Sequence, residues 1–183
     1  MARTGSIAAL LQRAESHKPC RNATGDARWA LLRAKGSLSA PSGSEKSIHA
    51  SLLQTFRAFA RNNAWSNHRL LSSCKRLSPA EFVAPRSGFF PSLQATLDHI
   101  LVIDWFYVDA LEGGRLGPKA WENEVPCPGI ESLISAQACV DRRLILQCDA
   151  LTEAALNTHV HVQRSAGVQS DRRDRLLMHL FQH

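Results

Sequence analysis

The chain centres on SLQATLDHILVIDWFYVDAL, which occupies residues 92–111. At 3.6 residues per turn its apolar side chains form two adjacent stripes, so a helix here is apolar over most of its circumference. Ser92 is a favourable N-cap, and Gly113-Gly114 is a stop signal. Such a helix is normally enclosed by other helices. The sequence therefore predicts a helical bundle in which residues 92–111 are central and His99 lies inside.

Three further helices are expected around the central one. Apolar residues repeat at helical spacing over about 49–76 and 130–150, and Ser170-Asp171 is expected to cap a last helix. Valines alternate over residues 158–170, which predicts a small β-hairpin before that last helix. The predicted fold class is all-α: a four-helix bundle with one hairpin. The last helix stops after about three turns without a capping signal, so the chain is expected to be incomplete there.

Four polar residues lie on or beside these apolar stripes. Asn63 and Asn67 fall on the inner face of the first helix, where hydrogen bonding across the bundle is expected. Asp104 falls on an apolar stripe of the central helix, whereas Asp98 is expected to be a solvated neighbour of His99. Either carboxylate is a candidate acceptor for a histidine N–H group or a candidate general base.

Residues 1–48 are expected to be a disordered or non-native N-terminal extension to a helical domain over residues 49–183. The extension holds eight Lys and Arg against three Asp and Glu, whereas the rest of the chain holds fourteen against thirteen. Most of the net charge of +6 therefore lies in the extension, and the folded part argues against nucleic-acid binding. The alternative for this Arg- and Ser-rich segment is an organelle-import signal.

Composition places the chain among soluble globular proteins, with 44% hydrophobic and 21% charged residues. The longest apolar run, residues 100–108, is interrupted by Asp104 and is far shorter than the roughly 20 residues of a membrane span. Five cysteines occur without paired spacing, which favours reduced thiols in the cytoplasm over a disulfide framework. We therefore expect a cytoplasmic protein without membrane segments.

Three histidines are the strongest candidates for chemistry. His179 and His183 are four residues apart on the last helix, so they project from the same face, and His99 lies on the central helix. Three neutral imidazoles commonly bind Zn²⁺, Ni²⁺ or Fe²⁺. The alternative for each is a hydrogen-bonded core histidine. His159 and His161 share a strand face and are expected to face solvent.

Three motifs together resemble the DinB family of DinB/YfiT-like metalloenzymes over residues 49–183. They are NAWSNHRLL at residues 63–71, FFPSLQATLDHIL at residues 89–101 and LLMHLFQH at residues 176–183. The resemblance implies an up-down-down-up four-helix bundle, often a homodimer, with one histidine ligand on the second helix and two on the last. His99 and His183 match two of these ligands, and the third would lie four residues beyond His183. His179 flanks the site or substitutes for the third ligand, so weak metal binding is expected.

The resemblance also implies a function. Relatives of this fold include metal-dependent thiol S-transferases, isomerases and hydrolase-like enzymes, which implies a low-molecular-weight thiol and an electrophilic small molecule as partners. The alternative is a non-catalytic, metal-binding stress-response protein, in keeping with the damage-inducible association in the family name. Whether the chain is an enzyme, and which metal and substrate it uses, stay open at this point.

Overall fold

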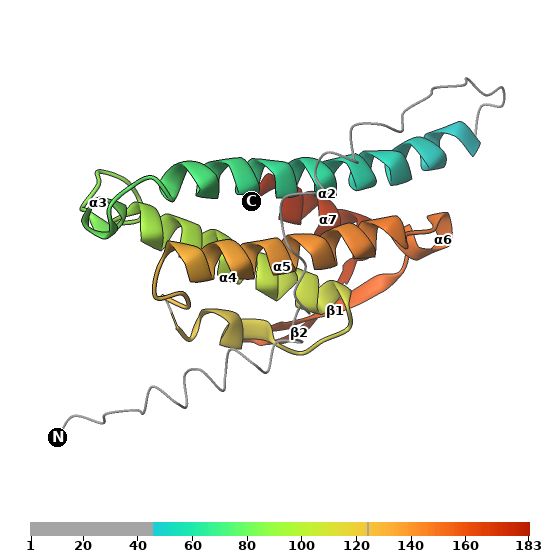
Figure 1. The fold of residues 1–183 in the computed structure, drawn as a ribbon. Helices are drawn as coiled ribbons and strands as arrows, with labels where there is room; N and C mark the ends of the chain where they lie inside the picture. The colour runs from blue at the N-terminus through green and yellow to red at the C-terminus, as the bar shows by residue number, and fades with distance from the viewer. Residues whose placement is uncertain (1–45, 124) are drawn as a thin grey trace. The chain divides into compact units, whose positions relative to one another are not determined.

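The computed structural model describes residues 46–123 and 125–183, with no side-chain description for residues 46–51. Its elements in order are α2 (Lys46–Cys74), α3 (Pro79–Val83), α4 (Leu93–Leu111), the 3-10 helix η2 (Gly117–Trp121), α5 (Ile130–Asp149), α6 (Glu153–Leu156), β1 (His159–Arg164), β2 (Gly167–Arg172) and α7 (Arg173–Gln182) (Figure 1). The described part is mostly helical with one small hairpin, as predicted. The expected extension over residues 1–48 lies outside the described residues, except for its last three, which begin α2.

Helix α4 has the central position that its sequence predicts. The hydroxyl of Ser92 accepts a hydrogen bond from the Ala95 N–H group at 3.1 Å, which caps the helix. Gly113, with a φ of 79°, turns the chain away just after the helix ends. Between these ends α4 packs against α3, α5, α7, η2 and β1. Its wide apolar surface is therefore covered by several different elements.

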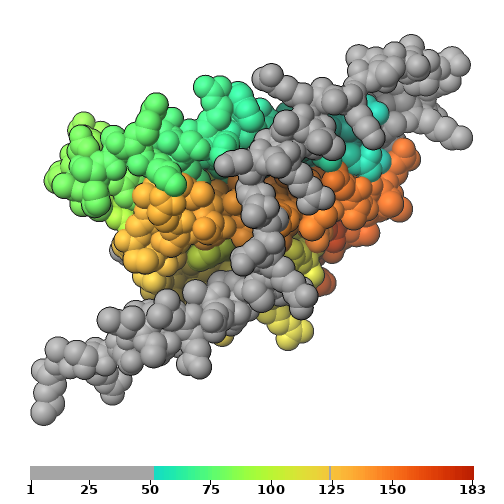
Figure 2. Space-filling model, viewed as in Figure 1, coloured from blue at the N-terminus to red at the C-terminus, as the bar shows by residue number. Residues whose placement is uncertain are grey.

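Helices α2 and α5 form the most extensive helix pair and run antiparallel. An ion pair joins Arg61, in the middle of α2, to Asp149 at the end of α5, with an N–O distance of 2.9 Å. A second pair joins Lys75, just beyond α2, to Glu131 at the start of α5, also at 2.9 Å. In the space-filling view the surfaces of α2 and α5 adjoin along the visible face (Figure 2).

Helices α4 and α5 run parallel. Gln137 of α5 bonds to Asp104 of α4, and further along both helices Arg143 bonds to Glu112. The guanidinium group of Arg143 donates two hydrogen bonds of 3.0 Å to the two carboxylate oxygens of Glu112. Bidentate pairing fixes the relative position of two helices more strictly than a single contact.

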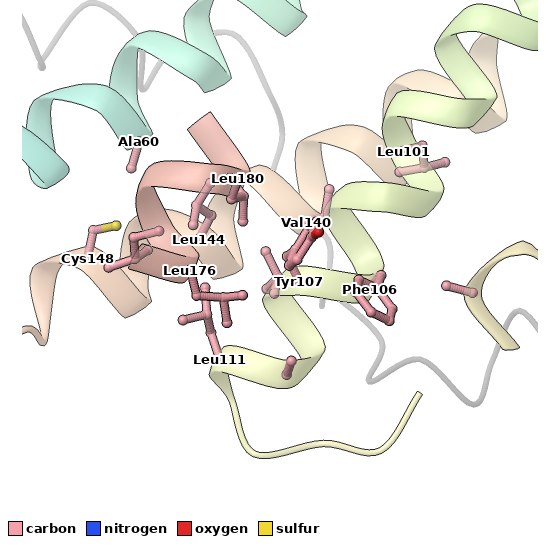
Figure 3. Close-up of a cluster of buried hydrophobic side chains, with 14 of the residues drawn as sticks. Ala60, Leu101, Phe106, Tyr107, Leu111, Val140, Leu144, Cys148, Leu176 and Leu180 are labelled. Atoms are coloured by element: carbon pink, nitrogen blue, oxygen red, sulfur yellow. The ribbon is translucent and has the colours of Figure 1, made fainter. Parts of the chain in front are cut away.

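The hydrophobic core lies where α4, α5 and α7 meet, and α2 closes it (Figure 3). The side chains labelled there are Ala60, Leu101, Phe106, Tyr107, Leu111, Val140, Leu144, Cys148, Leu176 and Leu180. Helix α7 is also attached to α2 through Phe181, whose ring centre lies 6.3 Å from that of Phe56 and 5.6 Å from that of Phe59. These contacts set the position of the histidines on α7.

The β-hairpin confirms one prediction and corrects another. The two strands pair antiparallel from His159 with Arg172 to Arg164 with Gly167, and the predicted solvent-facing His159 and His161 are exposed. The expectation that Ser170-Asp171 caps the last helix is wrong, because both residues pair with β1. Their backbone groups are part of the strand ladder, so α7 begins only at Arg173, without a side-chain cap.

Three of the four cysteines in the described part of the chain are buried. Cys74, Cys127 and Cys148 carry free, buried thiols. Burial raises the pKa of Cys127 to about 11 and that of Cys148 to about 12, so both remain protonated and unreactive. Cys139, on α5, is only partly buried. No helix in the described part of the chain combines the length and apolarity needed to cross a membrane.

Candidate metal centre

His99 lies on α4, and its side chain is half-buried rather than enclosed. Its ring centre is 4.5 Å from that of Phe90, which belongs to the loop before α4. The neighbouring Phe89 is 96% exposed, so only one of the two adjacent aromatic rings covers the histidine. The prediction that His99 lies inside is therefore only partly correct, because the residue is of intermediate exposure.

Helix α7 brings the other two histidines to His99. The ring centre of His183 lies 5.6 Å from that of His99 and 6.1 Å from that of His179. Both are exposed; His179 lies in the last turn of α7, and His183 directly follows the helix. All three residues singled out from the sequence are thus neighbours, although they come from segments far apart in the chain.

Tyr107 is a fourth neighbour, which the sequence pattern alone did not single out. Its ring lies 5.2 Å from that of His179 in an edge-on arrangement, and the residue is buried. Tyr107 follows His99 by eight residues, a little over two helical turns, so it lies on an adjoining part of the α4 surface. That spacing is the signal by which it could have been found. Because Tyr107 lies opposite His179 and His99 opposite His183, α7 runs antiparallel to α4.

The donor atoms suit a divalent transition metal, but their arrangement is looser than a bound site. Two imidazoles on one tetrahedral Zn²⁺ have ring centres about 5 Å apart, given Zn–N bonds of about 2 Å. The separations here are 5.6 and 6.1 Å. Across residues 46–123 and 125–183, no three His, Cys, Asp or Glu side chains are close enough together to form a ligand set. The cluster therefore consists of two neighbouring pairs of imidazole rings, His99 with His183 and His183 with His179, and not of a closed metal site.

The electrostatics of the cluster favour neutral imidazoles. Partial burial lowers the pKa of His183 below its ordinary value of 6.5, and the nearby His99 and His179 lower it further. Both effects act against the imidazolium form, because burial removes solvating water and two like charges repel. A neutral ring is the form that binds a metal. His183 is thus in its ligand-competent state at neutral pH.

Asp98 is not the solvated neighbour of His99 that the sequence analysis expected. It is fully buried, and neither carboxylate oxygen has a hydrogen-bond partner of good geometry. Burial raises its pKa to about 6, and the nearby side chain of Gln94 and backbone of Cys127 offset this only in part. The expectation failed because the loop after η2 covers the side of α4 on which Asp98 lies. The Asp98 carboxyl group therefore lies beside Gln94 and Cys127.

Asp104 belongs to a separate buried network between α2, α4 and α5. The side-chain amide of Gln137 donates to Asp104 at 2.7 Å and to Asp141 at 3.2 Å. Asn63 and Asn67 also donate to Asp141, at 3.3 and 2.9 Å, which confirms the predicted hydrogen bonding across the helices. The hydrogen-bond acceptors of this network are two carboxylates, and the donors named here are all neutral side-chain amides.

The two carboxyl groups of that network titrate at unusually high pH. Burial raises the pKa of Asp104 to about 7, and the neighbouring charge of Asp141 contributes in the same direction. Burial likewise raises the pKa of Asp141 to about 6. None of the hydrogen bonds found in the described part of the chain links either carboxylate to His99, His179 or His183. Asp104 is thus a buried structural acid rather than an acceptor for a histidine.

These features define a mostly helical protein with a cluster of histidines between its α4 and α7 helices. Comparison with protein families matches the DinB family over residues 51–183, and the chain belongs to that family. A comparison with curated proteins gives no match.

Proposed function

We propose that this DinB-family protein binds one divalent metal ion, Zn²⁺, Ni²⁺ or Fe²⁺, through His99 and His183. His179 supplies a third imidazole or substitutes for one. The observation that carries the proposal is the 5.6 Å approach of the His99 and His183 rings across two helices. Imidazole nitrogen is a preferred ligand of all three metals.

The proposed architecture is a four-helix bundle with up-down-down-up order, made by α2, α4, α5 and α7. Three pairwise directions support it. Helix α5 is antiparallel to α2 and parallel to α4, while α7 is antiparallel to α4. In this arrangement the metal would join the second helix of the bundle to the fourth.

The proposed activity is that of a metal-dependent thiol S-transferase or a related hydrolase-like enzyme. A bound metal would lower the pKa of a low-molecular-weight thiol and hold the thiolate. His179 and His183 are exposed, so a small molecule can reach the cluster from solvent. Phe90 would contact the organic part of the electrophile, because its partly exposed ring flanks His99.

A second candidate function is a non-catalytic, metal-binding stress-response protein. The observation that favours this second function is the position of the two aspartate side chains on α4. Asp98 lies beside Gln94 and Cys127, and Asp104 beside Gln137, so neither serves the histidines as a general base. In that case the metal would act only as a cross-link between α4 and α7.

Metal binding is tested by isothermal titration with Zn²⁺ and Ni²⁺. We expect one site per chain, weakened about tenfold or more in His99→Ala and in His183→Ala, because each loses a ligand. His161→Ala is the matched control, since His161 is exposed on β1 away from the cluster. Equal affinity in all four proteins would place the metal elsewhere and refute the proposal.

The two functions are separated by two measurements on the metal-loaded protein. A thiol transferase conjugates glutathione to 1-chloro-2,4-dinitrobenzene, loses that activity with a chelator and recovers it when metal is restored. A structural metal raises the melting temperature without turnover. Activity that persists after complete metal removal would contradict the proposed mechanism.

A further inference from the structure

A cavity of about 490 Å³, open to solvent on one side, lies beside α3, where the end of α2 and the beginnings of α4 and α5 come together. Its walls include Cys74, Phe82, Val83, Gln94, Ile130 and Ser132. None of the histidines of the candidate metal centre lines it. The volume lies within the range of small-molecule pockets, which is about 300–1,000 Å³. This space is thus a second candidate site, independent of the first.

One side of the cavity is formed by the short helix α3, which has a well-defined local structure. The backbone N–H group of Ser78 donates to the Glu81 carboxylate at 2.8 Å, and the Ser78 hydroxyl accepts from the Glu81 N–H group at 3.3 Å. Pro79 begins the helix, so its first turn is preorganised. Phe82 is the buried residue of α3. The short helix is therefore anchored by one ring, and Val83 at its end lines the open edge of the cavity.

The polar groups of the walls are already partnered within the protein. The side-chain amide of Gln94 donates to the Cys127 carbonyl at 3.0 Å, and the Ser132 hydroxyl donates to the Gly129 carbonyl at 2.7 Å. At the rim, Glu131 pairs with Lys75 at 2.9 Å. The remaining wall is largely apolar, made of side chains such as Phe82 and Ile130. A charged ligand would find no free counter-charge among these groups.

We propose that this cavity binds a small, neutral, apolar molecule, such as an aromatic or short aliphatic compound. Burial of apolar ligand surface against the walls supplies the affinity, at roughly 25 cal/mol per Å². Because the polar groups of the walls are already partnered, they offer water few free hydrogen-bonding sites, so the ligand displaces weakly held solvent. The site shares no residue with the metal centre, so a negative result here would not bear on the proposed function, and the reverse also holds.

The test uses N-phenyl-1-naphthylamine, a neutral dye that fluoresces on leaving water. We expect saturable binding of one dye per chain. Val83→Trp should weaken that binding about tenfold or more by filling the cavity from its edge. Val125→Trp is the matched control, because Val83 and Val125 are both 52% exposed and only Val83 lines the cavity. Absence of dye binding, or equal binding by the two variants, would overturn the proposal.

A second measurement needs no substitution and decides the case if Val83→Trp does not fold. Nuclear Overhauser effects between the dye and the unsubstituted protein report which methyl groups contact it. We expect effects to the methyl groups of Ile130 and Val83, and none to Val168, which is exposed on the hairpin. Dye contacts that omit Ile130 would contradict the proposed site.

Discussion

The imidazole rings of His99 and His183 lie 5.6 Å apart with their planes at 38°, and they belong to helices that run in opposite directions. His179 lies 6.1 Å from His183 on the other side, so His183 is the middle member of the cluster. Its protonation state is therefore affected by both neighbours.

Replacing His179 with Gln should raise the pKa of His183. In the folded protein that pKa is lowered below 6.5, by burial and then by His99 and His179. The substitution removes one repelling imidazolium, so the pKa moves back toward 6.5. An NMR titration of the ring protons measures the change, with His161→Gln as the control. An unchanged pKa in His179→Gln would mean that the two rings do not interact.

The same lowered pKa predicts how metal binding and stability depend on pH. Below pH 6.5 the unfolded chain binds the proton at this residue more readily than the folded chain, so falling pH destabilises the fold. Metal affinity falls over the same range, because the proton competes for the ligand nitrogen. Zn²⁺ titrations between pH 5 and 8 check this. Affinity that does not depend on pH would exclude imidazole ligands.

Adding a short segment after His183 whose fourth residue is histidine should strengthen metal binding. The DinB resemblance puts a third ligand at that spacing, where it would lie one helical turn beyond His183. We expect about tenfold tighter Zn²⁺ binding or more. The control carries alanine in place of the added histidine. Equal metal content in the two extended proteins, measured by elemental analysis, would argue against the assigned ligand set.

The substitution Asp104→Asn should make the free energy of unfolding less dependent on pH. The folded-state pKa of Asp104 is about 7 against an ordinary 3.8, so the folded chain holds this proton more tightly than the unfolded chain. Stability is therefore lost as pH rises from about 4 to 7, and Asp141, with a pKa of about 6, adds to the loss. Asparagine carries no charge and can still present an oxygen to Gln137.

Urea unfolding at pH 5 and pH 8 measures that effect. We expect Asp104→Asn to lose less stability between these pH values than the unsubstituted protein, by roughly 1–3 kcal/mol. An identical loss in both proteins would show that Asp104 does not ionise within the folded state over this range.

Asn67→Ala should destabilise the protein by about 1–3 kcal/mol, because it removes a hydrogen bond to a buried carboxylate. The amide of Asn67 donates to Asp141 at 2.9 Å. Asn62→Ala is the matched control, since Asn62 is exposed on the same helix and should change stability by only about 0.5 kcal/mol or less. Equal effects of the two substitutions, measured by thermal unfolding, would mean that the network contributes nothing.

Much of the helical framework was predictable from local patterns. The period of apolar residues in α4, the Ser92 cap and the alternation of Val160 and Val162 each depend on neighbours in the chain. The failure at Ser170 and Asp171 has a physical cause, because the same residues suit a helix cap and a strand end. Pairing with β1 decided between them.

The three histidines were predictable as a group because two are spaced by one helical turn and the third lies on the most apolar helix. Their final separations were not predictable, since these depend on how Phe181 places α7 against α2. Phe90 and Tyr107 became neighbours of the cluster for the same reason.

By itself the sequence determined the helical class, the positions of the long helices and the residue types of a histidine cluster, because periodicity and spacing act over one or two turns. Only the tertiary structure decided that Asp98 is buried without a partner, that Asp104 shares Gln137 with Asp141, and that a cavity remains beside α3. Burial and hydrogen-bond pairing depend on what packs opposite a residue, and the opposing residue is distant in the chain.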